Sequence, residues 1–356
     1  ALPISCNFLA PITAGGSITF TEKIVPSLVV KHIKESGVTV LIGVPLLFDK
    51  IKQGIRTEMD KLKGIKAVFV KTMFSASAFI TNSFGIRAGA MLLKFLRIKA
   101  GIASIRLGVA GGGPLSWGTA QFFEILGLNL VQGYGMSENG PLISVNLPEY
   151  KDNHSVGLPV KKTLVRIADS GSDGVGEIQV KSPSMMLGYM DAEAENEAIF
   201  SQDGWLRTGD LGYMDKRGFV YITGRSKNLI VTEGGKNVYP EEIESRFEGS
   251  VYIKEILVLG RYVNGGKAGE QVIAVCYPDW DRIEQETASK DRLNFASACI
   301  KEEIRAVNKT LPSHMKIVDF IVREDEFEKT STKKIRRFLY AFYAKTGSLG
   351  LEGARQ

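Results

Sequence analysis

The fold is decided by residues 105–138, which read IRLGVAGGGPLSWGTAQFFEILGLNLVQGYGMSE. The run Ile105–Ala110 predicts a strand, and three glycines and Pro114 follow it directly. Ser116–Leu126 has a helical pattern, and Leu130–Val131 begins a second strand. A strand, a helix and a second strand in this order predict a βαβ unit within a parallel sheet.

The residues before this unit alternate between short β-branched runs and longer periodic segments. Val38–Val44 and Ala67–Val70 predict strands, while Pro26–Ser36 and Leu46–Ile55 predict helices. This alternation is typical of an α/β sheet domain. Ile86–Lys99 predicts a basic amphipathic helix, which could touch a membrane surface weakly, although a packed surface helix has the same pattern.

The pattern changes after the βαβ unit. Between Val160 and Gly224, short strands alternate with Gly, Asp and Pro turns, which predicts a small β-rich subdomain; the strands are Leu164–Ala168, Glu177–Val180 and Phe219–Thr223. Beyond Gly224 the elements predict a compact α+β domain; they are helices at Glu241–Glu248 and Asp291–Thr310 and strands at Ile253–Gly260 and Glu270–Tyr277.

Composition limits the class of protein. The chain has 356 residues, of which 44% are hydrophobic, enough for a large core. Its 45 basic residues exceed its 39 acidic residues, for a net charge of +6, which favours anionic ligands such as nucleotides, CoA or fatty carboxylates. Five or more like charges never occur in a row, which argues against a nucleic-acid-binding arm.

The thiols and imidazoles are scattered along the chain. The cysteines have no paired spacing, which favours a reducing compartment, and the histidines have no metal-ligand spacing. We find no unbroken apolar stretch of about 18 residues and no signal-peptide layout, so we expect a soluble cytoplasmic protein. The residues concerned are Cys6, Cys276, Cys299, His32, His154 and His314.

Glycines follow the first strand of the βαβ unit. Gly111, Gly112 and Gly113 lack a Cβ atom, so a flat ligand such as a nucleotide base can approach their backbone. Glycines also serve tight turns, and the spacing does not match G-x-G-x-x-G. No clear ribose-binding acid follows about 20 positions later, so a dinucleotide-binding fold is a poor second choice.

Residues 133–138, GYGMSE, follow the second strand and combine three useful groups. Tyr134 can stack on a purine, Ser137 can bind a phosphoryl or carboxylate oxygen, and Glu138 can hold Mg²⁺. A strand-end turn with a buried tyrosine and a solvated glutamate would give the same letters. Further on, Asp210 lies in DGWLRTGDLG and Arg225 in GRSKN; a carboxylate can accept both ribose hydroxyls, and a guanidinium can bind ribose or phosphate.

Five segments together resemble the adenylate-forming superfamily of acyl-CoA synthetases, firefly luciferases and peptide-synthetase adenylation domains. They occur in family order and cover roughly residues 1 to 340. The segments are AGGGPL, GYGMSE, GWLRTGDLG, GRSKNLIVTEGGKNVYPEEIE and KTSTKKIRR.

The resemblance implies a role for each motif residue. The adenine site would comprise Gly111, Gly112, Gly113, Tyr134 and Gly135. Ser137 would contact the reacting phosphate, Glu138 the Mg²⁺ ion, and Asp210 the ribose. Arg225 would assist at ribose and phosphate. Lys227 would be the hinge of the small domain, and Gly234 and Gly235 would line the CoA tunnel.

Lys334 matches the catalytic lysine of the family. Its ammonium group would offset the charge that builds as the acyl carboxylate attacks the α-phosphate. Considered alone, a lysine in such a basic cluster would be a solvated charge or a contact for CoA phosphate. Lys333 replaces the usual preceding glycine, and long-chain acyl-CoA synthetases often carry a larger residue there, which favours that branch of the family.

The family's Ser/Thr/Gly-rich phosphate loop does not occur in this sequence. The chain begins at Ala1 and runs into an apolar stretch to Pro11, which reads as a start partway through a domain. Without backbone amides to cradle the β- and γ-phosphates, we expect the chain alone to bind ATP poorly. We also expect exposed edges and faces on the remaining sheets.

The resemblance therefore implies the following organisation and function. Residues 1–225 would be the carboxy-terminal part of the large domain, 226–346 the small mobile domain, and 347–356 a polar, disordered tail. The parent enzyme would use ATP, Mg²⁺ and CoA to convert a carboxylic acid, with a fatty acid favoured, into its adenylate and then its thioester. Alternatives are an aryl-CoA ligase, a peptide-synthetase domain, another adenylating enzyme, or a non-catalytic nucleotide-binding remnant.

Overall fold

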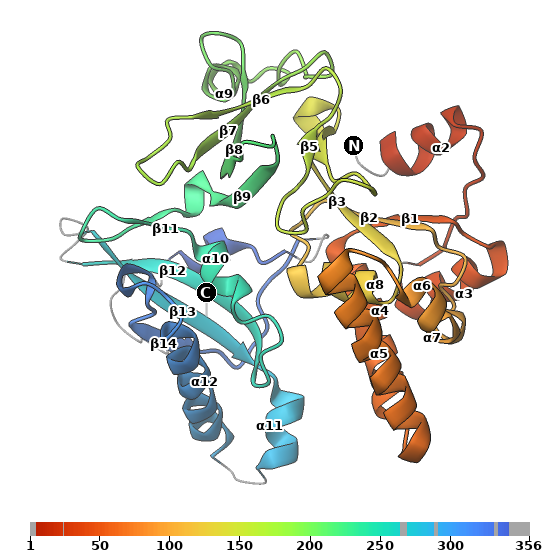
Figure 1. Ribbon diagram of the computed structural model, residues 1–356. Helices are drawn as coiled ribbons and strands as arrows, with labels where there is room; N and C mark the ends of the chain where they lie inside the picture. The colour runs from red at the N-terminus through yellow and green to blue at the C-terminus, as the bar shows by residue number, and fades with distance from the viewer. Residues whose placement is uncertain (1–4, 24, 264–268, 288–290, 331–333, 342–356) are drawn as a thin grey trace. The chain divides into compact units, whose positions relative to one another are not determined.

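The computed structural model describes residues 5–23, 25–263, 269–287, 291–330 and 334–341 (Figure 1). The chain divides into two compact units. The first comprises residues up to Thr208 together with Gly212–Ile222, and the second comprises Gly209–Leu211 and residues from Thr223 onward. The boundary expected after Arg225 lies close to this division, but the domain roles stay a prediction. The tail at 347–356 lies outside the described residues.

A five-stranded sheet forms the centre of the first unit. Its strands follow chain order, and the first three are parallel while the last two pair antiparallel. The predicted βαβ unit at residues 105–138 is therefore present in the described chain. The strands are β1 (Val40–Gly43), β2 (Leu107–Ala110), β3 (Asn129–Gly135), β4 (Leu142–Val145) and β5 (Leu158–Pro159). As expected, one edge lacks a neighbouring strand among the described residues, because β1 ends the sheet.

Helices pack on this sheet through one apolar core. Phe48 and Phe123 are almost fully buried, and their rings meet edge to face at 5.9 Å. Gly108 in β2 is required there, because a Cβ atom would lie 2.9 Å from Leu130 and 3.1 Å from Phe48. The helices of the first unit are α2 (Ala10–Thr13), α3 (Pro26–Ser36), α4 (Pro45–Asp60), α5 (Gly64–Phe84), α6 (Gly89–Leu92), α7 (Lys94–Lys99), α8 (Trp117–Ile125) and α9 (Glu193–Ile199), with a π-helical turn at Ser5–Leu9 and a 3₁₀ turn at Ser137–Asn139.

Helix α5 corrects two predictions. The strand predicted at Ala67–Val70 is wrong, because these residues lie inside this helix. Val70, Ser77 and Thr81 are buried at helical spacing, so packing on one side overrides the β-branched preference. The helix ends at Gly85, which has φ of 66°.

The expectation that no segment could span a membrane also fails for α5. By length and composition alone, this helix is long and apolar enough, with a mean hydropathy of 1.2 and only 17% of its apolar window buried. Lys66, Lys71 and the interspersed Ser and Thr residues hid it, because they break the apolar run although the average stays high. The amphipathic helix predicted at Ile86–Lys99 is two short helices, α6 and α7, which meet at Leu93.

A second, four-stranded sheet follows the first. Its strands lie in chain order: β6 (Leu164–Ala168), β7 (Gly176–Lys181), β8 (Leu206–Met214) and β9 (Val220–Arg225). Ile178, Val180 and Val220 pack with Tyr134 and Ile143 in one core cluster. The β-rich subdomain predicted between Val160 and Gly224 is thus observed.

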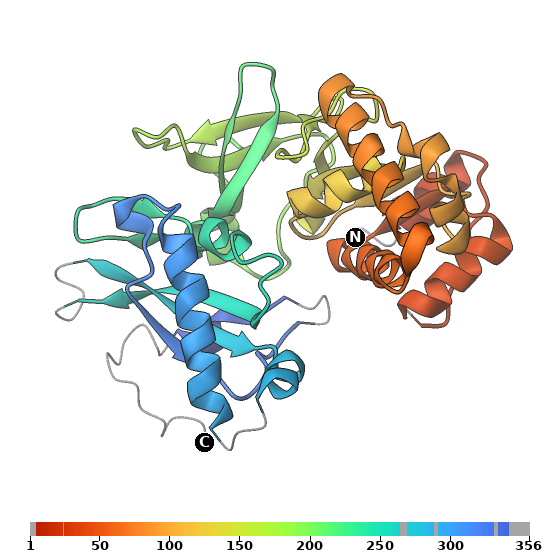
Figure 2. The same ribbon diagram turned by 60° about the horizontal axis from the view of Figure 1, so that its bottom comes forward.

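The second unit is an α+β arrangement, as predicted. Strands β12 (Ile253–Tyr262) and β13 (Glu270–Pro278) are antiparallel, and β14 (Asp319–Val322), which was not predicted, pairs parallel to β13. Figure 2 shows the long helix α12 (Arg292–Asn308) lying across this sheet. The remaining elements are α10 (Pro240–Ser245), α11 (Trp280–Glu286), the hairpin β10 (Ile230–Val231) and β11 (Asn237–Val238), and 3₁₀ turns at Ser226–Asn228, Ser313–Met315 and Arg337–Tyr340.

Candidate functional site

The glycine loop leaves the carboxyl end of the parallel sheet. Ala110 at the end of β2 pairs with Gln132 of β3, so both strands deliver their motifs to the same edge. Gln132 Nε2 donates to Gly113 O at 3.5 Å, and Gly111 N donates to Gly43 O at 3.0 Å. Gly112 is exposed with φ of +79°, a conformation that L side chains rarely adopt. The loop therefore presents backbone rather than side chains at this edge.

Tyr134 and Gly135 end the neighbouring strand. Tyr134 is only 8% exposed and packs in the cluster that contains Ile143 and Val156. Packing is thus a demonstrated role of this ring, and stacking on a purine stays a prediction. Position 135 requires glycine for a steric reason, because a Cβ atom there would lie 1.9 Å from Pro141 O.

Glu138 is held by a later segment of the chain. Its Oε1 accepts a hydrogen bond from Tyr189 Oη at 2.8 Å, and its main-chain oxygen accepts one from Met186 N at 2.8 Å. Burial, followed by this bond to the carboxylate, raises the pKa of Tyr189. Ser137 beside it is exposed. The sequence pattern did not indicate a role for the Tyr189 hydroxyl.

Asp210 and Arg225 meet in the second unit. Arg225 Nε lies 2.7 Å from Asp210 Oδ1, and the aspartate side chain is 9% exposed whereas the arginine side chain is 57% exposed. Ser226 Oγ donates to Gly209 O at 3.2 Å, which joins the two segments again. Two motifs separated by 15 positions in the sequence (225 − 210) thus form one contact.

Lys334 lies within electrostatic range of this pair. Desolvation and then the charge of Arg225 lower its pKa, while the Asp210 carboxylate acts in the opposite direction. Thr330 fixes the lysine backbone, because Lys334 N donates to Thr330 Oγ1 at 3.2 Å and Thr330 N donates to Lys334 O at 2.8 Å. The structure therefore joins Asp210 and Arg225 in one ion pair, and Lys334 from a third motif feels the charge of both. Lys333 lies outside the described residues.

The hinge and tunnel residues lie in exposed turns. Lys227 is in the 3₁₀ turn Ser226–Asn228, and both glycines lie between β10 and β11. Gly235 has φ of +67°, whereas the φ of Gly234 is outside the left-handed region. A Cβ atom at either glycine would meet nothing within 4 Å among the described residues. Nothing here tests the roles of these three residues.

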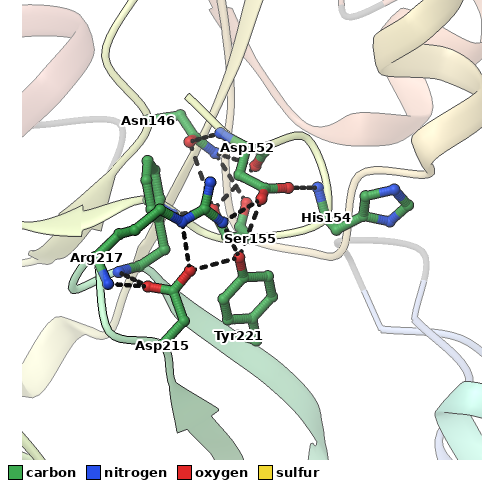
Figure 3. A network of polar contacts seen from close by, with 9 residues as sticks. Asn146, Asp152, His154, Ser155, Asp215, Arg217 and Tyr221 are labelled. Carbon is green, nitrogen blue, oxygen red and sulfur yellow. Dashed lines mark hydrogen bonds and ion pairs between the residues drawn. The ribbon is translucent and has the colours of Figure 1, made fainter. Parts of the chain in front are cut away.

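Figure 3 shows a polar network in the first unit that the sequence did not indicate. Arg217 Nη2 donates to Asp152 Oδ2 at 2.8 Å, its Nε donates to Asp215 Oδ2 at 2.8 Å, and Tyr221 Oη donates to Asp152 Oδ2 at 3.0 Å. Burial disfavours the ionised Asp152, but hydrogen bonds from Arg217, His154 N and Tyr221 outweigh it and lower its pKa. The network joins two loops 65 positions apart, and no spacing rule reveals such a contact.

A model of the AMP-binding enzyme family matches residues 2–190, more than half of the chain. The chain belongs to the AMP-binding enzyme family. Among curated relatives of this family member are the long-chain-fatty-acid–CoA ligase ACSBG2 of Gallus gallus and the long-chain-fatty-acid–CoA ligase heimdall of Drosophila melanogaster. The first is 27% identical over 368 residues and the second 26% identical over 379 residues. The matches cover 92% and 95% of this chain but 48% and 56% of the relatives, so the chain spans about half their length.

Solved structures agree on the fold of this AMP-binding chain. ATP-bound MatB from Rhodopseudomonas palustris has a TM-score of 0.68 at 23% identity, with coverage of 95% of this chain and 57% of that one. MenE from Bacillus subtilis, an o-succinylbenzoate CoA synthetase in complex with its acyl-adenylate, has a TM-score of 0.68 at 23% identity, with coverage of 93% and 57%. The predicted superfamily and the mixed α/β class are therefore confirmed.

Proposed function

We propose that the protein containing this chain is an ATP-dependent, AMP-forming acid–thiol ligase. It activates a carboxylic acid as an acyl-adenylate with release of pyrophosphate, and it then transfers the acyl group to CoA. A fatty acid is the proposed acid. Family membership supports adenylate chemistry, and the names of the relatives support the acid.

The observation that carries the proposal is the ion pair of Asp210 and Arg225 in the second unit, with Lys334 in the electrostatic field of both residues. A buried carboxylate that already binds one guanidinium nitrogen can accept ribose hydroxyls, and the remaining nitrogens of the arginine can bind phosphate. A lysine in the same field supplies an ammonium group where negative charge develops during adenylation. Three unrelated surface charges would have no reason to gather from three motifs.

The first unit, considered by itself, also carries groups that suit a nucleotide. Gly112 exposes its backbone at the end of β2, between the buried Gly111 and the half-buried Gly113, which suits a purine base or a sugar. Glu138 uses one oxygen for Tyr189, which leaves a carboxylate able to bind a metal through a single oxygen. Within the described residues, no cluster of three or more His, Cys, Asp or Glu side chains could hold a metal ion. Mg²⁺ therefore fits this site only with one carboxylate, nucleotide phosphates and water, its usual mode with nucleotides.

The thioester step is assigned to the exposed turns of the second unit. Lys227 would be the pivot of the small domain, and Gly234 and Gly235 would border the path of the CoA thiol arm. Open space around both glycines supports this assignment, because a pantetheine chain needs backbone without side chains.

The choice of a fatty acid rests on relatives and on apolar surface. Leu187 and Met190 are 105% and 89% exposed beside Tyr189, so apolar side chains adjoin the Glu138 turn. An aryl acid is the second candidate, because MenE, a solved structure of the same fold, is an o-succinylbenzoate CoA synthetase. We further propose that the protein works in the cytoplasm; the described cysteines Cys6, Cys276 and Cys299 are free thiols.

Pyrophosphate exchange tests the first step. We would measure exchange with hexadecanoate, benzoate and malonate, using this chain and the full-length protein that contains it. The expected result is exchange with hexadecanoate by the full-length protein. A failure of the full-length protein with every acid would overturn the ligase proposal and favour a nucleotide-binding remnant.

A lysine substitution tests the assignment of roles. In the full-length protein, Lys334→Ala should abolish adenylation and leave thioester formation from supplied acyl-adenylate largely intact. Lys316→Ala, also exposed in the second unit, is the matched control and should change neither step. Equal loss of both steps in Lys334→Ala would reassign this lysine to CoA or to structure.

A further inference from the structure

Helix α5 exposes much of its apolar surface, although Phe74 packs on the core against Phe122. Ile65, Val68, Phe69 and Phe79 are 89%, 66%, 57% and 66% exposed. Their spacing places them along one side of the helix, where the intervening positions hold small, uncharged side chains. Figure 1 shows α5 projecting beyond the ends of α4 and α8.

The opposite side of α5 packs on the core partly through hydroxyl groups. Ser77 is fully buried and donates from Oγ to Ile125 O at 2.6 Å, and Thr81 Oγ1 donates to Ile86 O at 3.0 Å. In a helix that only covers a core, aromatic residues would face inward and hydroxyls outward. Val70 and Phe74 also face the core, so both sides of α5 carry apolar side chains, whereas a helix that only covers a core would have one apolar side.

The short helices that follow extend this apolar surface. The rings of Phe69 and Phe95 lie 6.5 Å apart, so α5 and α7 share one face. Ile98 of α7 and Met91 of α6 are 55% and 80% exposed. A contiguous apolar surface of this kind marks a binding face. We call seven residues the α5 face: Ile65, Val68, Phe69, Phe79, Met91, Phe95 and Ile98.

Charge distinguishes between possible occupants of the α5 face. From Lys61 to Phe123 the sequence contains no Asp or Glu. The same stretch has nine basic residues: Lys61, Lys63, Lys66, Lys71, Arg87, Lys94, Arg97, Lys99 and Arg106. Lys66 and Lys71 are exposed on the two sides of the stripe that runs along α5. Glu58 of α4 pairs with Lys61 and Lys99, so the charge argument rests on Lys66 and Lys71. An apolar face between these two lysines complements an anionic surface that also accepts apolar side chains.

We propose that the α5 face binds the surface of an anionic lipid bilayer, with α5 lying parallel to the membrane plane. Apolar side chains would enter the boundary between headgroups and acyl chains, and the flanking lysines would meet anionic headgroups. A spanning orientation is disfavoured, because Ser77 and Thr81 would have to leave their main-chain partners. The inference does not depend on the proposed ligase activity.

The expected strength of vesicle binding follows from the charges of the lysines beside the α5 face. Each lysine near an anionic surface contributes about 1 kcal/mol, which corresponds to about fivefold in binding. Replacing Lys66 and Lys71 with glutamine should therefore weaken binding to anionic vesicles about 25-fold. Binding to vesicles without net charge should be weak and should change little.

Vesicle flotation of the full chain tests the proposal. The probes are vesicles of phosphatidylglycerol with phosphatidylcholine, and vesicles of phosphatidylcholine alone. The variants are K66Q/K71Q and F69S/F79S, with K301Q and F338S as controls, since Lys301 and the 67% exposed Phe338 lie in the second unit. Circular dichroism and analytical ultracentrifugation without lipid accompany each variant.

The expected result is binding to anionic vesicles that high salt weakens and that both α5 variants lose, while both controls keep it. Equal binding to the two kinds of vesicle, or no loss in the α5 variants, would overturn the proposal. Self-association without lipid that F69S/F79S abolishes would also overturn it, because the face would then bind a second copy. None of these outcomes depends on pyrophosphate exchange.

Discussion

Glu244 binds Arg337, which lies in the segment that follows Lys334. Glu244→Gln tests how much this contact stabilises the second unit. Arg337 Nη1 donates to both carboxylate oxygens at 2.8 and 2.9 Å. Arg337 Nη2 donates to Val258 O at 2.6 Å, and Val258 N donates to Glu244 Oε1 at 2.7 Å. The side chains of the pair are 20% and 19% exposed, so both are largely buried.

The expected loss of stability follows from the charge and the donors that glutamine would leave unpaired. Both carboxylate oxygens face donors, so the amide NH₂ of glutamine meets a donor in either orientation. Arg337 cannot lose its proton and would stay charged in a largely buried position. Removing one partner of a buried pair costs about 3 to 5 kcal/mol, and we expect about 3 kcal/mol because water still reaches the pair.

Burial affects Glu244 and Arg337 differently, because only the glutamate can become neutral. Desolvation raises the pKa of Glu244 despite the charge of Arg337, so this carboxyl can take up a proton when its partner is lost. Arg337→Met should therefore destabilise the second unit less than Glu244→Gln does. Which of the two variants destabilises the second unit more is a second test of the same reasoning.

Hydrogen exchange of the amides of helix α12 measures the free energy of unfolding of the second unit. Glu244→Gln should lower it by about 3 kcal/mol and the melting temperature by about 10 °C. Glu242→Gln on the same helix is the control, because its ion pair with Arg246 is 3.8 Å long and exposed, and it should cost less than about 0.5 kcal/mol. Equal costs for the two variants would refute the reasoning.

Three further predictions concern single residues. In the full-length protein, Gly234→Leu should slow thioester formation and spare adenylation, and kinetics of the two half-reactions would show it; Gly235→Ala adds backbone strain at φ of +67° and should also lower stability. Because the folded-state pKa of Asp152 is lowered, its contribution to stability is present above about pH 4 and lost as the pH falls further; urea unfolding as a function of pH should show a smaller acid loss in Asp152→Asn. Tyr189→Phe removes the hydrogen bond to Glu138 and should raise the Mg²⁺ concentration that gives half-maximal pyrophosphate exchange, with hexadecanoate affinity unchanged.

Local patterns predicted the fold where neighbours in sequence decide it. The helix Pro26–Ser36 has the predicted bounds, because a proline begins it and Gly37 follows it. The strand Leu164–Ala168 also has the predicted bounds. The strand predicted at Ala67–Val70 failed because the core contacts of α5 come from residues far along the helix. Strand β14 was not predicted, because its partner β13 lies more than forty positions earlier in the sequence, beyond any local pattern.

The site was predicted as a set of motifs, and contacts between motifs came only from the structure. Asp210 and Arg225 each carry an ordinary turn signal, and only the pairing of their segments makes them one site. Tyr189 was missed because a hydroxyl in an apolar segment has no spacing signature. Such contacts depend on tertiary packing, which a single sequence does not specify residue by residue.

The same contacts predict that two neighbours shift the pKa of Lys334 in opposite directions. Arg225→Gln should raise it, because a positive charge is removed and Asp210 is freed from its ion pair to act on the lysine. Asp210→Asn should lower it, because the opposing carboxylate is lost and Arg225 is left uncompensated. The two effects on each variant have the same sign, so neither can cancel the other.

Amine labelling as a function of pH, read by mass spectrometry of the peptide that contains Lys334, measures both shifts. Lys301 on α12 is the internal control and should label identically in all three proteins. Shifts in the same direction, or none, would mean that Lys334 does not share a field with the other two residues. Opposite shifts would establish that the residues expected at the ribose also set the charge of the lysine expected at the α-phosphate. That coupling would exist in the free protein, before any nucleotide binds.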